Sequence, residues 1–164
     1  MIDADDVNVV PWKLELIKGY LKRDDWDVLT FNRNDYYDIW ALMYPPFQHH
    51  CFGFFDKSIK VIRYIQNDVR NRLGSCKEWI ECQSAFNGFA MYKTPLFTGI
   101  RYDGEYKNQH ALIPEEARQG TLHALATLDV KLNEENCESC EHLYYHLMAS
   151  QKNSVRVYIS KYKL

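Results

Sequence analysis

Residues 1–8 read MIDADDVN, which sets three carboxylates directly behind two apolar residues at the start of the chain. A disordered acidic tail would carry more polar residues and would lack the Val-Asn-Val-Val-Pro-Trp run of residues 7–12. In an extended backbone, residues two apart point to the same face, so Asp3 and Asp5 can reach one cation while Asp6 points elsewhere. The stretch therefore predicts the end of a buried strand that supplies two hard oxygen ligands.

Two other structures place carboxylates in a similar pattern. An EF-hand loop needs a glycine at its sixth position and a glutamate at its twelfth, and the Val-Asn-Val-Val run excludes it. Carboxylates are also favoured at helix N-termini, and Pro11 predicts a helix that begins close behind them. Helix capping and metal binding therefore both remain open from this stretch alone.

Composition indicates one globular domain. The 164 residues are 46% hydrophobic and 15% aromatic, which is enough to bury a core as one domain or as a large piece of one. A formal net charge of -2 gives no general attraction to nucleic acid or to anionic membranes, although a local basic patch stays open. We therefore expect no nucleic-acid partner.

Targeting signals and cysteine usage predict the compartment. No apolar run approaches the roughly 20 residues that span a bilayer, and no signal-peptide pattern opens the chain. The cysteines are odd in number, five, and widely spaced, unlike the framework of a small secreted domain. We expect a soluble, cytoplasmic protein with reduced thiols and no membrane span.

Strand and helix patterns alternate along the chain, which predicts an α/β fold. The clearest helix has Asp56 as a candidate N-cap, an apolar stripe at helical spacing over residues 59–73, and Gly74 as a stop. Further helices are expected over 11–22 and 142–149, strands over 26–31, 36–44, 79–83, 86–92 and 155–159, and a loop or short-helix excursion over 104–136.

Residues 84–93, SAFNGFAMYK, hold an Asn-Gly pair between apolar and aromatic residues. Asn87 and Gly88 can form a tight hairpin turn. Alternatively, the alternation continues beyond Gly88 as one strand, and a glycine at the mouth of a buried strand lets the backbone approach a ligand, with the Asn87 amide beside it. Both interpretations stay open here.

Residues 137–146, CESCEHLYYH, place two cysteines three apart and two histidines four apart. This set suggests a structural zinc site, but such sites usually separate their ligand pairs by a dozen or more residues, so four ligands here would be cramped. We expect His146 to be a helix residue packed against the sheet. His142 follows a carboxylate at a loop-to-helix junction, where a ligand can point outward.

Taken in order, four blocks resemble a GT-A glycosyltransferase of the group found in large DNA viruses and some microbes. The blocks are Asp-x-Asp-Asp, Phe-Asn-Gly-Phe-Ala-Met-Tyr-Lys, Arg-Tyr-Asp-Gly, and Cys-Glu-His followed by a helix and the strand Val-Arg-Val-Tyr-Ile. The resemblance covers essentially the whole chain, and the order and spacing of the four blocks are more specific than the Asp-x-Asp alone. It implies a Rossmann-like mixed sheet flanked by helices and a single domain over residues 1–164.

The resemblance also implies a site. Asp3 and Asp5 would hold a divalent metal, Mn²⁺ or alternatively Mg²⁺, against the diphosphate of a nucleotide-sugar donor, and His142 would complete the metal shell. Asn87 and Gly88 would border the sugar and acceptor pocket, and Asp6 would contact the donor.

The chemistry agrees with these roles. Glycosyl transfer must stabilise a departing diphosphate, and a divalent ion supplies that charge. A mixed oxygen and nitrogen ligand set suits manganese better than magnesium. Glu141 would act as a base on the hydroxyl of a glycan or protein acceptor, or would orient His142. Retention or inversion of the anomeric centre is not determined by the fold.

One feature departs from the family. GT-A enzymes carry strands and helices upstream of the Asp-x-Asp that bind the base and ribose, and here Met1 and Ile2 directly precede it. The expectation is therefore the C-terminal part of such a domain, N-terminally incomplete. Two alternative functions remain: a zinc-stabilised interaction module built on Cys137 and Cys140, and a glycosyltransferase remnant without activity.

Overall fold

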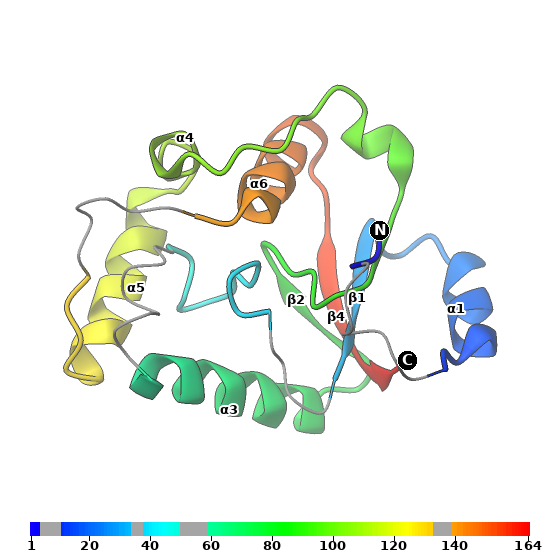
Figure 1. The fold of residues 1–164 in the computed structure, drawn as a ribbon, viewed down its shortest axis with the longest axis horizontal. Coiled ribbons are helices and arrows are strands. Elements are labelled where there is room, and N and C mark those ends of the chain that lie inside the picture. The colour runs from blue at the N-terminus through cyan, green and yellow to red at the C-terminus, as the bar shows by residue number, and fades with distance from the viewer. Residues whose placement is uncertain (4–10, 34–37, 50–58, 133–138) are drawn as a thin grey trace.

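The computed structural model of the chain describes residues 1–3, 11–33, 38–49, 59–132 and 139–164. They form a mixed α/β structure in which helices flank a four-stranded sheet (Figure 1). The strands are β1 (Val28–Asn32), β2 (Trp79–Cys82), β3 (Ala90–Tyr92) and β4 (Val157–Lys163), in the order β2-β4-β1-β3. The helices are α1 (Leu14–Leu21), α3 (Ile59–Ser75), η2 (Thr94–Phe97), α4 (Tyr106–His110), α5 (Glu115–Thr127) and α6 (Glu141–Asn153).

The sheet is mixed in direction. The central strands β1 and β4 pair in parallel, with Leu29 opposite Tyr158. The outer strands run the other way, because β3 pairs antiparallel with β1 and β2 pairs antiparallel with β4. The α/β class and the mixed sheet flanked by helices, both expected from the sequence, are confirmed.

The first three residues extend the sheet beyond β3. Ile2 forms an isolated antiparallel bridge with Phe89. On either side of it, the Ala90 amide donates to the Met1 carbonyl at 3.1 Å, and the Asp3 amide donates to the Gly88 carbonyl at 2.9 Å. Asp3 therefore lies at the end of a short extended segment on the β3 edge.

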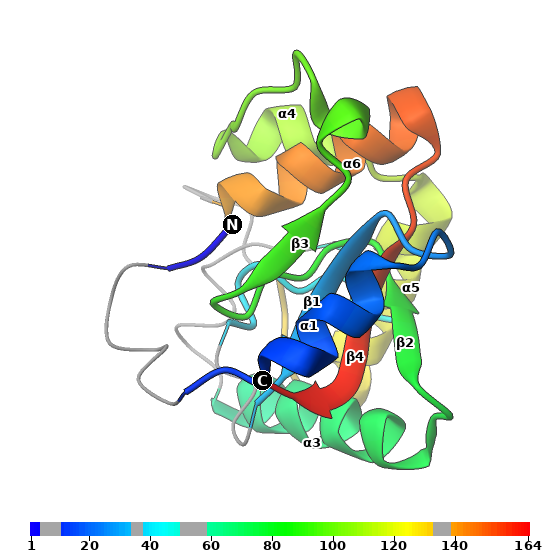
Figure 2. The same cartoon turned by 90° about the vertical axis from the view of Figure 1, so that its right-hand side faces the viewer.

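Apolar clusters lie on both faces of the sheet. Alternate residues of β1 point to opposite faces, so Leu29 and Phe31 pack with Tyr20 of α1, while Val28 packs in the larger cluster. Figure 2 shows α1 crossing in front of β1 and β4, and Figure 1 shows α3, α5 and α6 on the other side.

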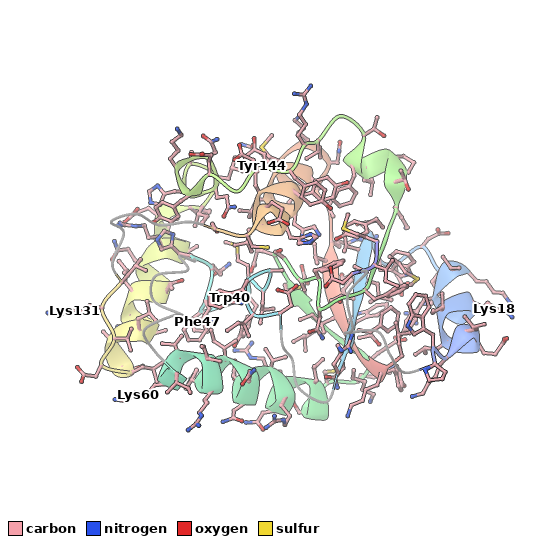
Figure 3. All side chains as sticks on the ribbon, viewed as in Figure 1. Lys18, Trp40, Phe47, Lys60, Lys131 and Tyr144 are labelled. Atoms are coloured by element: carbon pink, nitrogen blue, oxygen red, sulfur yellow. The ribbon has the colours of Figure 1, made fainter. Side chains whose placement is uncertain are left out.

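The segment from residue 38 to residue 49 fills much of the larger cluster. Phe47 is fully buried (Figure 3). Its ring contacts the ring of Tyr44 and that of Tyr64, which lies in α3. Trp40 is half-buried and packs against the same cluster (Figure 3). This segment was expected to continue a strand over 36–44, and that expectation is wrong for residues 38–44. Two isolated bridges, at Met43 and Tyr44, are its only β pairing among the described residues.

Several element boundaries differ from the sequence expectation. The helix expected to stop at Gly74 continues through it to Ser75, and its candidate cap Asp56 lies outside the described residues. Strand 86–92 is shorter than expected, since β3 begins only at Ala90. The excursion over 104–136 contains the short helix α4 but also the 13-residue α5, which is longer than expected. Its periodicity is weak because Thr121 and Leu125 are its only buried residues.

Within the described residues, no helix combines the length and apolar character that crossing a membrane requires.

Candidate functional site

The sequence-predicted site residues come from three places in the structure. Asp3 lies at the β3 edge, and Glu141 and His142 open α6. Asn87 and Gly88 form the turn that leads into β3. Asp5 and Asp6 lie outside the described residues, so their predicted roles stay predictions.

Asp3 and His142 are neighbours electrostatically, although they come from opposite ends of the chain. Burial lowers the pKa of His142, whereas the nearby carboxylates of Glu141 and Asp3 act in the opposite direction. The expected convergence of Asp3, Asp5 and His142 on one metal ion stays a prediction, because Asp5 lies outside the described residues.

Aromatic rings hold the His142 side chain in place. The Phe86 ring stacks on it at 4.3 Å between centroids with an interplanar angle of 15°. Tyr102 meets it edge to face at 5.3 Å and 89°. The Nδ1 atom of His142 is buried and has no hydrogen-bond partner among the described residues. A buried ring nitrogen in this state has the free lone pair or proton that a ligand would use.

Asp38 joins this group, and the sequence analysis did not identify it. Its Oδ1 accepts from the Ala41 amide and its Oδ2 from the Asn87 amide, each at 3.2 Å. Burial raises the pKa of Asp38 to about 6, the two backbone amides oppose that shift, and the carboxylates of Asp3 and Glu141 add to it. A single aspartate in a stretch rich in apolar and aromatic residues gives no sequence signal, because only the fold brings it to Asn87.

Asn87 and Gly88 form a tight turn. Both have positive φ, 56° and 84°. The turn does not form the hairpin that the sequence left open, because β2 and β3 lie at opposite edges of the sheet and do not pair. The Asn87 side chain is buried and its Nδ2 donates to the Phe31 carbonyl at 3.0 Å. The Thr30 hydroxyl lies within reach of the carbonyls of Phe86 and Phe89 on either side.

This turn connects Asp38 to Asp3. Asp38 binds the Asn87 amide, and the next carbonyl, that of Gly88, accepts from the Asp3 amide. The backbone position of Asp3 is therefore set by the turn. The proposed contact of Asn87 and Gly88 with donor or acceptor is a separate matter and stays a prediction.

His146 is a structural residue, as expected. It is fully buried, its Nδ1 lies 2.7 Å from the Ser84 hydroxyl and its Nε2 lies 3.0 Å from the Tyr92 hydroxyl. Burial lowers the pKa of His146 to about 3, so the ring is neutral near pH 7. Because both ring nitrogens have partners, His146 has no lone pair left for a metal in this arrangement.

The cysteines that the sequence suggested as zinc ligands do not form a metal site among the described residues either. Cys140 is buried, and burial raises the pKa of its thiol, while Cys137 lies outside the described residues. Across the described part of the chain, no three His, Cys, Asp or Glu side chains are grouped closely enough to hold a metal ion. A metal at Asp3 and His142 would therefore need ligands from elsewhere, such as Asp5.

Comparison of the chain with protein-family models, with curated proteins and with solved structures finds no match. The chemistry of the site therefore has to be argued from its residues.

The site combines three carboxylates with the neutral imidazole of His142. Asp3, Asp38 and Glu141 interact with one another or with His142 through space. Such a group attracts a cation or the hydroxyl protons of a ligand. Phe86 and Tyr102 supply apolar surface beside it, as ligand sites commonly do.

Proposed function

We propose that the chain is a metal-dependent glycosyltransferase of the GT-A type, which transfers a sugar from a nucleotide-sugar donor to a hydroxyl acceptor on a glycan or protein. The observation that carries the proposal is a buried His142 Nδ1 that lacks a partner among the described residues. His142 stacks on Phe86, and the turn that follows Phe86 binds the Asp3 amide through the Gly88 carbonyl. The mixed sheet, with Asp3 at the end of a short segment on its edge, supports the fold assignment.

The residues fit a divalent metal. An unpartnered buried imidazole nitrogen beside a carboxylate is a nitrogen and oxygen donor set, which suits Mn²⁺. Asp3 and His142 would hold the ion together with Asp5. When bound, the ion would supply positive charge that stabilises the diphosphate leaving group.

The residues of the chain have their own tasks in this proposal. Phe86 and Tyr102 hold the His142 ring in one orientation, so a ligand meets a preorganised donor. The turn at Asn87 and Gly88 fixes the backbone of Asp3.

Glu141 is the proposed base. It is exposed in the first turn of α6, where a helix N-terminus favours a carboxylate. Among the described residues it makes no hydrogen bond to His142, which favours the role of base on the acceptor hydroxyl over the role of orienting residue.

Manganese titration by calorimetry tests the proposal. His142→Phe keeps an aromatic ring against Phe86 and removes both nitrogens, so we expect manganese affinity to fall by roughly 100-fold or more, because even outer-shell changes cost about 10- to 100-fold. Asp5→Ala should act in the same direction, and Glu116→Gln in the exposed first turn of α5 should leave affinity unchanged. Equal manganese affinity in the wild type and in His142→Phe would exclude the site.

A further inference from the structure

Tyr102 and Tyr145 form a stacked pair beside the proposed metal site. Their ring centroids lie 4.3 Å apart with an interplanar angle of 13°. Tyr102 belongs to the segment between η2 and α4, and Tyr145 belongs to α6. Tyr102 also meets His142 edge to face at 5.3 Å. We call Tyr102 and Tyr145 the tyrosine platform.

Phe97 and Met1 hold the tyrosine platform in position. Tyr145 packs against Phe97 of η2 at 4.8 Å between centroids. The Tyr102 hydroxyl donates to the Met1 sulfur at 2.9 Å, which fixes the far end of the ring. A ring whose orientation is set in advance loses little conformational entropy when a ligand stacks on it.

The tyrosine platform is partly open to solvent. Tyr102 is 42% exposed although Tyr145 stacks on one of its faces. Part of Tyr102 is therefore accessible to a ligand.

A carboxylate lies close to the tyrosine platform. Glu141 is exposed and directly precedes His142, which contacts Tyr102. Glu141 also lies one helical turn before Tyr145 on α6. The surface therefore combines a flat apolar ring with an anionic hydrogen-bond acceptor.

This combination matches a pyranose ring. A pyranose has an apolar face of C–H groups, which stacks on an aromatic ring, and hydroxyls around its rim, which donate to a carboxylate. A nucleobase also stacks, but in a nucleotide sugar the ribose separates the base from the diphosphate, whereas the tyrosine platform touches His142 itself.

We propose that the tyrosine platform binds the pyranose ring of the acceptor, with one acceptor hydroxyl directed to Glu141. This rests on the proposed transferase function for the identity of the ring as acceptor, because Glu141 is the base there. Tyr102 supplies the stacking face, and Tyr145 keeps Tyr102 in position.

Ligand-observed NMR with the full chain tests the tyrosine platform. The probes are methyl glucopyranoside, galactopyranoside and mannopyranoside, with uridine and guanosine as nucleosides. We expect at least one pyranoside to receive saturation on the C–H protons of a single ring face and to shift upfield, since an aromatic ring shields protons above it. Tyr102→Phe should retain this signal, and Tyr102→Leu should lower affinity about tenfold, as expected for loss of an aromatic contact.

The control is Tyr162→Leu, which removes a tyrosine of β4 with a similar exposure of 44% and should leave binding unchanged. Wild-type affinity and the same upfield shift in Tyr102→Leu overturn the proposal. So does a wild type that binds no pyranoside, or one in which only nucleosides give Tyr102-dependent signals.

Manganese calorimetry on the same samples separates the two proposals. Manganese affinity without pyranoside binding would refute sugar binding at the tyrosine platform, and the proposed transferase function would stand. Tyr102-dependent pyranoside binding without manganese affinity would refute the proposed transferase function and the identity of the pyranose as acceptor. It would still support a sugar-binding surface at the tyrosine platform.

Discussion

Asp38 and His146 contribute to the pH dependence of stability with opposite signs. Burial raises the pKa of Asp38 from 3.8 to about 6, so between these values the folded state binds a proton that the unfolded state lacks, and stability falls as pH rises. Burial lowers the pKa of His146 from 6.5 to about 3, so between these values the unfolded state binds the extra proton, and stability falls as pH falls. From about pH 4 to 6 the two contributions oppose each other.

Asp38→Asn separates the two contributions. The variant removes the Asp38 contribution, so its stability relative to the wild type should rise by up to about 3 kcal/mol from pH 4 to pH 7, since one pKa unit corresponds to about 1.4 kcal/mol. Any cost of the weaker hydrogen bonds to Ala41 and Asn87 is present at both pH values and cancels in this difference. Urea unfolding at several pH values measures it, with the exposed Asp24→Asn as control. A stability difference independent of pH would show that Asp38 titrates normally.

At the scale of single elements, a substitution at Gly88 tests the turn that holds Asp3, and a substitution at Gly120 inside a helix is the comparison. Gly88 has φ 84°, where a side chain strains the backbone, so Gly88→Ala should cost roughly 1–2 kcal/mol. Gly120 lies inside α5 with nothing within 4 Å of an added Cβ, so Gly120→Ala should stabilise by about 0.5–1 kcal/mol. Chemical denaturation measures both. Gly88→Ala should also weaken manganese binding, because the Gly88 carbonyl holds the Asp3 amide, and a neutral Gly88→Ala would contradict the turn.

Prediction from the sequence succeeded where the signal was local. Helix α3 was expected because Ile59, Ile62, Ile65, Val69 and Leu73 recur at helical spacing. Ile65, Val69 and Leu73 are buried as that stripe predicts, whereas Ile59 is exposed and Val61 is buried in its place. Helix α5 gave no such stripe, since Thr121 and Leu125 are its only buried residues and one of them is polar. Its length was therefore underestimated.

The same limit applies to the site. His142 stood out because it follows Glu141 at a predicted junction, and in the structure it is the second residue of α6 and packs against Phe86 and Tyr102. Asp38 did not stand out, because its position depends on a hydrogen bond to Asn87 across 49 residues of sequence. Contacts of this kind are set by the fold as a whole, and residue spacing carries no record of them.

At the scale of the whole molecule, the core and the site are built independently. Apolar clusters on both faces of the sheet hold the strands together, and His146 is satisfied by Ser84 and Tyr92. None of these contacts requires a metal. In a zinc-stabilised module, by contrast, metal binding and folding are one process, and chelation unfolds the domain.

Thermal unfolding with and without metal distinguishes these cases. We expect a strong chelator to leave the transition of the wild type nearly unchanged. Manganese at 100 times its dissociation constant should stabilise the folded state by about 2.7 kcal/mol, because it binds only that state. For a chain of 164 residues this corresponds to a rise of roughly 5–10 °C in the melting temperature. His142→Phe should remove most of that rise while its own metal-free transition stays cooperative, since His142 packs at the edge of the core through its ring. Unfolding by the chelator, together with stoichiometric zinc in the native protein by mass spectrometry, would contradict this expectation and establish a structural metal.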